Sequence, residues 1–444
     1  MREITTDQIH RYKEEFYSDP RNMITMNAVT ANGVLKCARN VDTERRDINE
    51  FSVLLKSGEI TNQKKSGRCW MFAALNVVRY QIMKSLKLET FELSENFVYF
   101  YDKLEKANYF LENILETLDE PGDSRLIAWL LESPVADGGQ WDMIVSLIEK
   151  YGIVPKYAMP ETTPSSESAE MNAALTEKLR GYACVLRREY KNGESIEELR
   201  GRKDDMIDAI YRMLCVCLGC PPESFDLEIR DKDHKYVRDT NLTPVDFYRK
   251  YAKLDLSQFV SLINAPTENK PFHRSYGVRF LGNVRGGRPV RYLNLEIEEL
   301  KEAAIRQLEA GLPVWFGSEV SRHFAREGGI LDAKIFDRGA LFNTDFTMTK
   351  AERLDYGQSK MTHAMVFLGV NLDEDGKPNR WKVENSWGKD RGKEGYLLMS
   401  DDWFTENLYQ IVVDRKFLPE KLIEEYEAEP IMLEPWDPMG SLAD

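Results

Sequence analysis

The sequence predicts an α+β fold in which a mainly helical first half precedes a half rich in β-strands. Up to about residue 224, apolar residues recur at helical spacing, as at Leu175, Leu179 and Leu186. From about residue 225, short apolar runs bounded by turn residues replace that pattern, as at 259–263. At 444 residues the chain is long enough for one large domain or for two to three ordinary ones.

Composition and charge narrow the classes of function. With 42% apolar and 30% charged residues, the chain has the composition of a soluble globular protein. Its net charge of −14 makes nucleic acid and anionic membranes unlikely partners. The start has no apolar core of signal-peptide length, and no run reaches the ~18 residues of a membrane span. Six cysteines without a regular framework indicate the reducing cytoplasm.

Residues 1–60 are expected to form an N-terminal arm. Thr6 and Asp7 can cap a helix that runs to Phe16, and Asp19-Pro20 is expected to stop it. The segment that follows, to residue 59, is mixed and charged without a clear period. We expect it to wrap the outside of a domain.

Residues 61–224 are expected to form the helical domain. A polar loop from Gln63 changes abruptly into an apolar run from Trp70 to Val78 that contains neither Pro nor Gly. This pattern predicts a helix buried on nearly all sides. Further helices are expected at 95–118, from the glycine pair at 138–139 to about 151, at 169–191 and at 195–218, the last two as an insertion.

Residues 225–420 are expected to form the β-rich domain, and 421–444 a C-terminal arm. The expected strands of the β-rich domain lie at 225–229, 259–263, 292–295 and 314–316, and a helix is expected at 296–310. Two further β-rich runs, 362–370 and 380–388, flank an Asp-Gly turn and predict an antiparallel hairpin. The basic cluster 285–291 is expected to be a solvated turn, with a functional patch as the alternative.

Cys69 is a candidate nucleophile. It lies at the first turn of the predicted buried helix, where backbone N–H groups and the helix dipole favour a thiolate. The alternative is a buried structural cysteine. Cys215, Cys217 and Cys220 end an apolar helix and have no second Cys/His pair at zinc-ligand spacing, so we expect neither a metal site nor a cofactor.

The hairpin supplies a histidine with a polar partner. Of the five histidines, only His363 lies at a strand end whose partner strand carries an amide, Asn385. Their positions average to 374, inside the turn, so pairing is expected to bring them close to opposite one another. Trp387 could cover this contact, although an ordinary core tryptophan is equally consistent with the sequence.

These residues together suggest acyl transfer. A Cys–His pair with an orienting Asn supplies a nucleophile, a general base and a group that fixes the imidazole tautomer. The developing oxyanion needs donors, for which the Cys69 N–H and the Gln63 amide are candidates. Gly138 and Gly139 either let a ligand approach the backbone or simply make a tight turn.

The set resembles the papain-like cysteine peptidases, and within them the bleomycin hydrolase and bacterial aminopeptidase C family. Gln63, Cys69-Trp70, His363 and Asn385-Ser386-Trp387-Gly388 appear in that family's order. The variants Cys69–Asn76 and Asp137–Met143 and the tail Glu434–Gly440 carry the closer likeness. The resemblance implies a two-domain papain-like fold, one domain helical and one an antiparallel, barrel-like sheet, with helical insertions and both arms. It also implies a homohexamer, and Gly138 and Gly139 as substrate-binding residues.

The family further implies that the C-terminal carboxylate enters the cleft, where it would pair with a substrate's α-ammonium. The resemblance therefore predicts a broad cysteine aminopeptidase acting on peptides, with bleomycin-hydrolase-like amide hydrolysis as a further activity. Whether Asp444 or Ala443 supplies the working carboxylate stays open. The alternatives are an oligomeric endopeptidase and a non-catalytic or nucleic-acid-binding relative.

Overall fold

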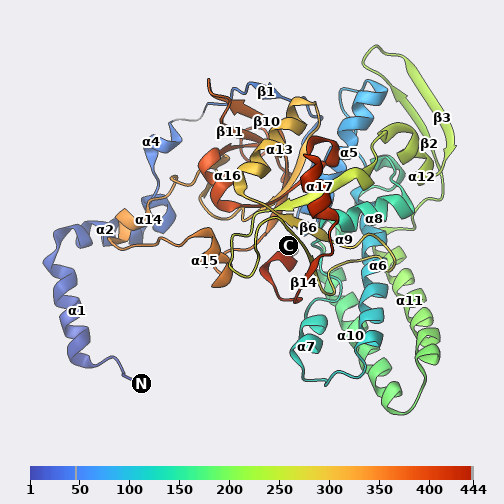
Figure 1. Cartoon of the computed structure of the whole chain (residues 1–444), viewed down its shortest axis with the longest axis horizontal. Coiled ribbons are helices and arrows are strands. Elements are labelled where there is room, and N and C mark those ends of the chain that lie inside the picture. Colours follow the sequence, from blue (N-terminus) through green and yellow to red (C-terminus); the bar gives the residue numbers. More distant parts are fainter. Residues whose placement is uncertain (46–47, 442–444) are drawn as a thin grey trace.

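The computed structural model describes residues 1–45 and 48–441 (Figure 1). An N-terminal arm extends away from the body of the molecule, and its first two helices, α1 and α2, bury no side chain. The arm consists of α1 (Thr6–Ser18), α2 (Pro20–Asn32), α3 (Val34–Cys37) and α4 (Val41–Glu44).

The cap of α1 and the role of Asp19-Pro20 differ from the sequence prediction. Thr5, not Thr6 or Asp7, caps α1, and its side chain and that of Gln8 exchange hydrogen bonds with each other's backbone N–H groups. Asp19 and Pro20 do end α1, but they also begin α2, because Asp is a good N-cap and Pro suits the first helical turn.

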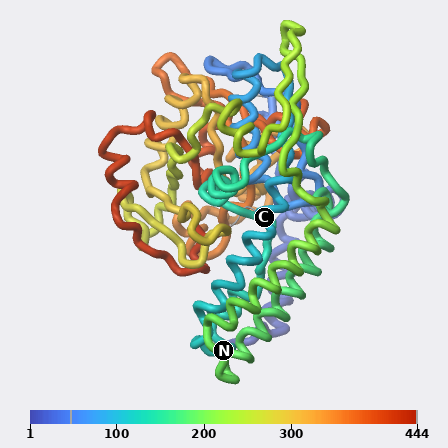
Figure 2. The backbone as a smooth tube through the Cα atoms, turned by 90° about the vertical axis from the view of Figure 1, so that its right-hand side faces the viewer, coloured from blue at the N-terminus to red at the C-terminus, as the bar shows by residue number. Residues whose placement is uncertain are grey.

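The helical half is built around α5 (Cys69–Leu86), as predicted. Thirteen of its eighteen residues are buried. The long helices α10 and α11 run beside α6 as an elongated bundle (Figure 2). The other helices of this half are α6 (Glu95–Glu116), α7 (Arg125–Glu132), α8 (Trp141–Tyr151), α9 (Thr163–Ser166), α10 (Ala169–Lys191) and α11 (Ile196–Leu218).

The second half contributes most of a large mixed sheet, in the order β14-β5-β6-β4-β13-β7-β10-β11-β12-β9-β8, with β1 paired to β10. Most pairs are antiparallel, whereas β4–β6, β5–β14 and β9–β12 are parallel. Its strands are β1 (Val53–Leu54), β4 (Phe259–Ile263), β5 (Arg274–Val278), β6 (Arg291–Asn294), β7 (Val314–Ser318), β8 (Phe324–Ala325), β9 (Ile330–Leu331), β10 (His363–Leu372), β11 (Pro378–Glu384), β12 (Tyr396–Ser400), β13 (Leu408–Asp414) and β14 (Ile431–Leu433).

Short helices and one separate hairpin complete the second half. β2 (Phe225–Arg230) and β3 (Tyr236–Leu242) form a two-stranded ribbon apart from the large sheet (Figure 1). The helices are α12 (Pro244–Phe247), α13 (Ile297–Glu309), α14 (Arg338–Phe342), α15 (Lys350–Asp355), α16 (Asp401–Asn407) and α17 (Glu420–Glu427).

The sheet separates two hydrophobic clusters, and β10 shows how. Ala364, Val366 and Leu368 belong to the cluster around α5, whereas Met365 and Phe367 belong to the cluster around α13 and α16. Because successive side chains of a strand point to opposite faces, an almost continuous apolar run can serve both clusters. The strand that begins with His363 is thus held firmly from both sides.

The basic cluster 285–291 is not the solvated turn that the sequence predicts. Arg288 Nε lies 2.6 Å from a carboxylate oxygen of the buried Asp142 on α8, and its guanidinium also donates to the carbonyl oxygen of Phe259. Arg285 binds Glu116 of α6. Sequence periodicity could not reveal these acidic partners because they lie more than 140 residues away along the chain. The cluster ties the helices to the sheet.

Candidate active site

Cys69 is the first residue of α5 and is almost completely buried. Its Sγ accepts a hydrogen bond from the backbone N–H of Ala364, at 3.4 Å. Ala364 directly follows His363 in β10, so the hydrogen bond joins the cysteine to the histidine strand. Cys69 and His363 also line one cavity of about 420 Å³, together with Gln63, Thr362 and Trp387. The structure thus brings a thiol and an imidazole from distant parts of the chain into one cavity.

His363 and Asn385 meet, although not in the predicted register. The ladder pairs Val366 with Glu384, an offset that would set His363 opposite Trp387 rather than Asn385. The pairing register estimated from the sequence was therefore wrong by two residues. A shift of two keeps every side chain on its face, because the period of a strand is two. Asn385 lies just beyond β11 and reaches back diagonally, so that its Oδ1 lies 2.9 Å from His363 Nε2.

Burial controls the protonation of His363. Loss of hydration lowers its pKa to about 4, and the hydrogen bond to Asn385 opposes that shift by favouring the charged ring. At neutral pH the imidazole is therefore neutral, which is the form that can accept a proton. The ring of Trp387 stacks on that of His363, with centroids 4.6 Å apart and planes 28° apart, and covers it on one side.

Gln63 is held by two segments. Its Oε1 accepts a hydrogen bond from Ser386 Oγ at 2.7 Å, and its Nε2 donates to the carbonyl oxygen of Ser66 at 2.6 Å. An amide nitrogen carries two protons, and the bond to Ser66 uses one of them. Gln63 lines the same cavity as Cys69. The amide is therefore fixed in orientation beside the N-terminus of α5, where backbone N–H groups also point outward.

The buried carboxylate of Asp137 connects the cysteine loop to the glycine pair. It accepts hydrogen bonds from the N–H of Gly67 and from Tyr99 Oη, and Lys103 Nζ lies 2.7 Å away. These partners hold the pKa of Asp137 far below its usual range, although burial works in the opposite direction. Gly139 must lack a side chain, since a Cβ there would lie 2.5 Å from the ring of Trp70.

A second buried ion pair lies directly before the cysteine. The Arg68 guanidinium forms two hydrogen bonds with the Glu161 carboxylate, at 3.0 and 2.7 Å, and Arg68 Nε donates to Ser66 Oγ. Neither Ser386, Asp137 nor Arg68 was assigned a role from the sequence. Ser386 and Arg68 adjoin predicted site residues, which is a usable signal, but the buried partners of Asp137 are visible only in three dimensions.

The described part of the C-terminal arm ends in hydrogen bonds beside the glycine pair and the histidine strand. Gln140 Nε2 donates to the carbonyl oxygen of Ser441 at 2.8 Å, and Ser441 Oγ donates to that of Met361 at 2.9 Å. Gln140 directly follows the glycine pair, and Met361 lies two residues before His363. Asp444, the predicted source of the carboxylate, lies outside the described residues.

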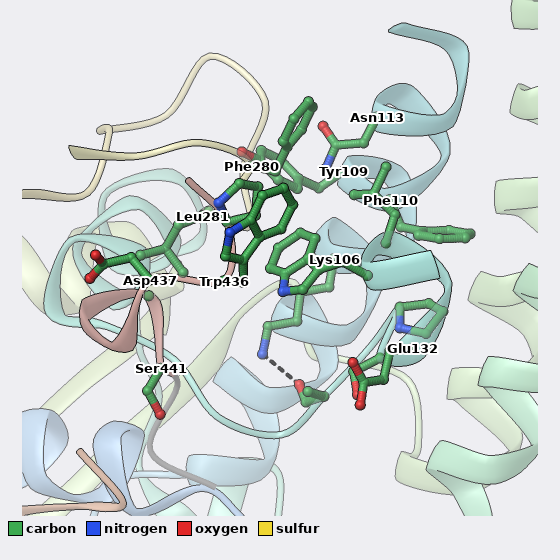
Figure 3. A pocket seen from close by; sticks show the side chains of 18 of the residues that line it. Lys106, Tyr109, Phe110, Asn113, Glu132, Phe280, Leu281, Trp436, Asp437 and Ser441 are labelled. Atoms are coloured by element: carbon green, nitrogen blue, oxygen red, sulfur yellow. Dashed lines mark hydrogen bonds between the residues drawn. The ribbon is translucent and has the colours of Figure 1, made fainter. Parts of the chain in front are cut away.

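A second cavity, also of about 420 Å³, lies beside this arm (Figure 3). Aromatic rings from two helices, the 280–282 loop and the arm line it, among them Tyr109, Phe110, Phe280 and Trp436. It shares no lining residue with the cavity that contains Cys69. Outside this cavity, the guanidinium of Arg125 lies 3.9 Å from the centre of the Trp436 ring and holds the arm from the other side.

Within residues 1–45 and 48–441, no group of three His, Cys, Asp or Glu side chains could hold a metal ion. Over the same ranges, every helix is too short or too polar to cross a membrane. None of the six cysteines, all of which are described, is in a disulfide.

Comparisons with known proteins agree with this geometry. The family model described as the peptidase C1-like family matches residues 3–440, and the chain belongs to that family. It is 47% identical over 445 residues to an aminopeptidase C of Lactobacillus delbrueckii subsp. lactis, covering 100% of this chain and 99% of the relative. It is 41% identical over 450 residues to bleomycin hydrolase of Gallus gallus, covering 99% of each. The crystal structure of PepW from Lactobacillus rhamnosis superposes with a TM-score of 0.98 at 50% identity, covering 99% of each chain.

Proposed function

We propose that the protein is a cysteine aminopeptidase that releases N-terminal residues from peptides with broad specificity. The observation that carries this proposal is the shared cavity of Cys69 and His363, with Asn385 on the far ring nitrogen and Gln63 beside the thiol. The family and its curated relatives support the reaction class. Hydrolysis of a bleomycin-like amide, the activity in the name of the Gallus gallus relative, is a further candidate reaction.

The roles we assign follow ordinary acyl-transfer chemistry. Neutral His363 takes the thiol proton, and the Cys69 thiolate attacks the carbonyl carbon of the scissile bond. The Cys69 N–H and the second Gln63 amide proton stabilise the oxyanion. Collapse breaks the C–N bond, and the imidazolium gives its proton to the leaving amine. His363 then removes a proton from water, which attacks the thioester and releases the acid and the thiol. Asn385 keeps the ring oriented, and Trp387 keeps water from that contact.

Two ends of the cleft are assigned different roles. Gly138 and Gly139 would bind the substrate backbone, and the arm that follows Ser441 would block the cleft beyond the first residue. A carboxylate at the chain end, from Asp444 or Ala443, would pair with the substrate's α-ammonium. The hydrogen bonds of Ser441 support this, since they direct the arm toward the glycine pair and the histidine strand. If the arm left the cleft open, the enzyme would be an endopeptidase.

Active-site labelling tests the assignment. A peptide with a free amino terminus and a thiol-reactive group at its carboxyl end is expected to modify Cys69 and to abolish turnover. Cys69→Ala should remain folded, by circular dichroism, and should lose both labelling and activity. Modification of another cysteine, or peptidase activity retained in Cys69→Ala, would refute the proposal.

We also propose an oligomeric state and a cellular compartment. The family resemblance favours a homohexamer, and the exposed apolar side chains of the arm, such as Ile9, Tyr17 and Ile24, suit contact with other copies. Native mass spectrometry should then give six chains, and a monomer would contradict it. Cysteines outside disulfides fit the cytoplasm, and recovery of activity only outside the cell would contradict that placement.

A further inference from the structure

Lys64 occupies an unusual position at the wall of the catalytic cavity. It directly follows Gln63, is exposed, and lines the cavity that contains Cys69 and His363. Its φ of 55° lies in the left-handed region, which side-chain-bearing residues seldom adopt. The N–H of Lys64 donates to Oδ1 of Asn62 at 2.9 Å, which helps to hold this conformation. The position of the side chain is therefore set by a defined turn rather than by a loose loop.

This turn adjoins the part of the cavity wall that Trp387 forms. Asn62 forms a β-bridge with Trp387 and packs against Gly388, where an added Cβ would lie 2.5 Å from its amide nitrogen. Gln140, which binds Ser441 of the arm, does not line this cavity, whereas Trp387 and Lys64 do. If the arm receives the amino end of a peptide, the leaving portion of that peptide extends toward Trp387 and Lys64.

The ammonium group of Lys64 is available to a ligand. The neighbouring Lys65 also lines the cavity, but its Nζ pairs with Glu167 at 3.0 Å. Across the described ranges, Lys64 forms no ion pair. The acid that precedes the cavity-lining Ser321, Glu319, is buried and accepts hydrogen bonds from Ser321. An anion that enters this end of the cavity therefore meets one cation without a protein counter-charge.

We infer that Lys64 binds the C-terminal carboxylate of short peptides, and so makes dipeptides and tripeptides with a free carboxylate the favoured substrates. The inference rests on the proposed aminopeptidase function. In a dipeptide or tripeptide, that carboxylate follows the scissile bond by only one or two residues, so it stays close to the cavity that Cys69 and Lys64 both line. The carboxylate and the ammonium form a charge-assisted hydrogen bond at an exposed side chain, so its contribution to binding is modest.

The test compares peptides that differ only in this charge. Leu-Gly and Leu-Gly-Gly are each paired with their C-terminal amides, and kcat/KM is measured by quantifying released leucine. The ratio of acid to amide cancels any general change in activity. Wild type should favour the acid of at least one pair about two- to fivefold, which corresponds to the upper part of the range for an exposed ion pair, and less at high salt. Lys64→Met should abolish this preference, Lys64→Arg should retain it, and Lys64→Glu should reverse it.

Lys65→Met is the matched control, because it removes the adjacent, already paired charge and should leave the ratio unchanged. The inference is overturned if wild type hydrolyses acids and amides equally well. It is also overturned if Lys64→Met keeps the wild-type ratio, or if Lys65→Met changes it as much. If wild type cleaved none of the four peptides, that result would instead count against the aminopeptidase function itself.

Discussion

The start of α5 and the C-terminal arm both contact the segment around His363, and the protein holds them in different ways. The start of α5 is embedded in the core, where Trp70 donates to the backbone of Asp137 and the carbonyl oxygen of Trp70 accepts from Trp315. Ser441, the last described residue of the arm, is half-buried and is held by hydrogen bonds with Gln140 and Met361.

This difference separates the two tasks of the site. The nucleophile and its oxyanion donors need fixed positions, since catalysis falls steeply when reacting groups are misplaced. Burial of thirteen residues of α5 supplies that rigidity. In the proposed function the arm only has to limit which substrates enter the cleft, so a few hydrogen bonds would suffice. Changes to the α5 side should therefore reduce the rate, whereas changes to the arm should alter the choice of substrate.

The largest effect should come from Gln63→Ala on the rigid side. Loss of an oxyanion donor should lower kcat about 100- to 1000-fold while KM changes little, because the donor acts mainly in the transition state. Steady-state kinetics on a fluorogenic aminoacyl amide would measure this. A large rise in KM with normal kcat would show that Gln63 binds the ground state instead.

Ser386→Ala sharpens the same prediction. Ser386 donates to Gln63 Oε1, so it should act only through the orientation of that amide and should lower kcat by about tenfold. In the double variant the two effects should not add, because Ser386 has nothing left to orient. Additive losses would show that Ser386 contributes by another route.

Most of the fold could be predicted from the sequence because local residue patterns determine its helices and strands. The apolar run after Cys69 and the helical spacing at 169–191 and 195–218 predicted helices that the structure confirms. Element ends were less accurate, as Thr5 and Asp19 show, because several adjacent residues can cap a helix. The predicted register of the hairpin was wrong by two residues because the turn is centred on Asp375 and not on residue 374, as the pairing of Leu372 with Pro378 shows. The two bulges shift the register in opposite directions and cancel before Val366.

The site could be predicted only in part from the sequence, because some of its residues are marked by local patterns and others only by tertiary packing. Cys69, His363 and Asn385 stand out because they lie at element ends within recognisable patterns. Asp137 and Glu161 do not, since a buried carboxylate has the same sequence appearance as a solvated one. Their importance depends on partners such as Lys103 and Arg68, and tertiary packing alone brings these pairs together.

A further prediction concerns the C-terminal arm. Removal of residues 441–444 should lower aminopeptidase kcat/KM by about tenfold, the cost of one charge-assisted contact, and should permit internal cleavage of a peptide with a blocked amino terminus. Mass spectrometry of the products would measure both. The free energy of unfolding should fall by about 1–3 kcal/mol, the contribution of the two hydrogen bonds of Ser441. An unchanged product pattern would remove the arm from the account of specificity.

Ser441→Ala offers a graded version of the same change. It removes the hydrogen bond to the carbonyl oxygen of Met361 but keeps the one that Ser441 accepts from Gln140. One hydrogen bond contributes about 0.5–1.5 kcal/mol, so the population with the arm in place should fall about two- to tenfold relative to the open form. Internal cleavage should therefore appear at a level between wild type and truncation. An effect equal to truncation would mean that this bond alone holds the arm, whereas no effect would mean that the rest of the arm, anchored by the buried ion pair of Lys270 with Asp437, fixes it without help.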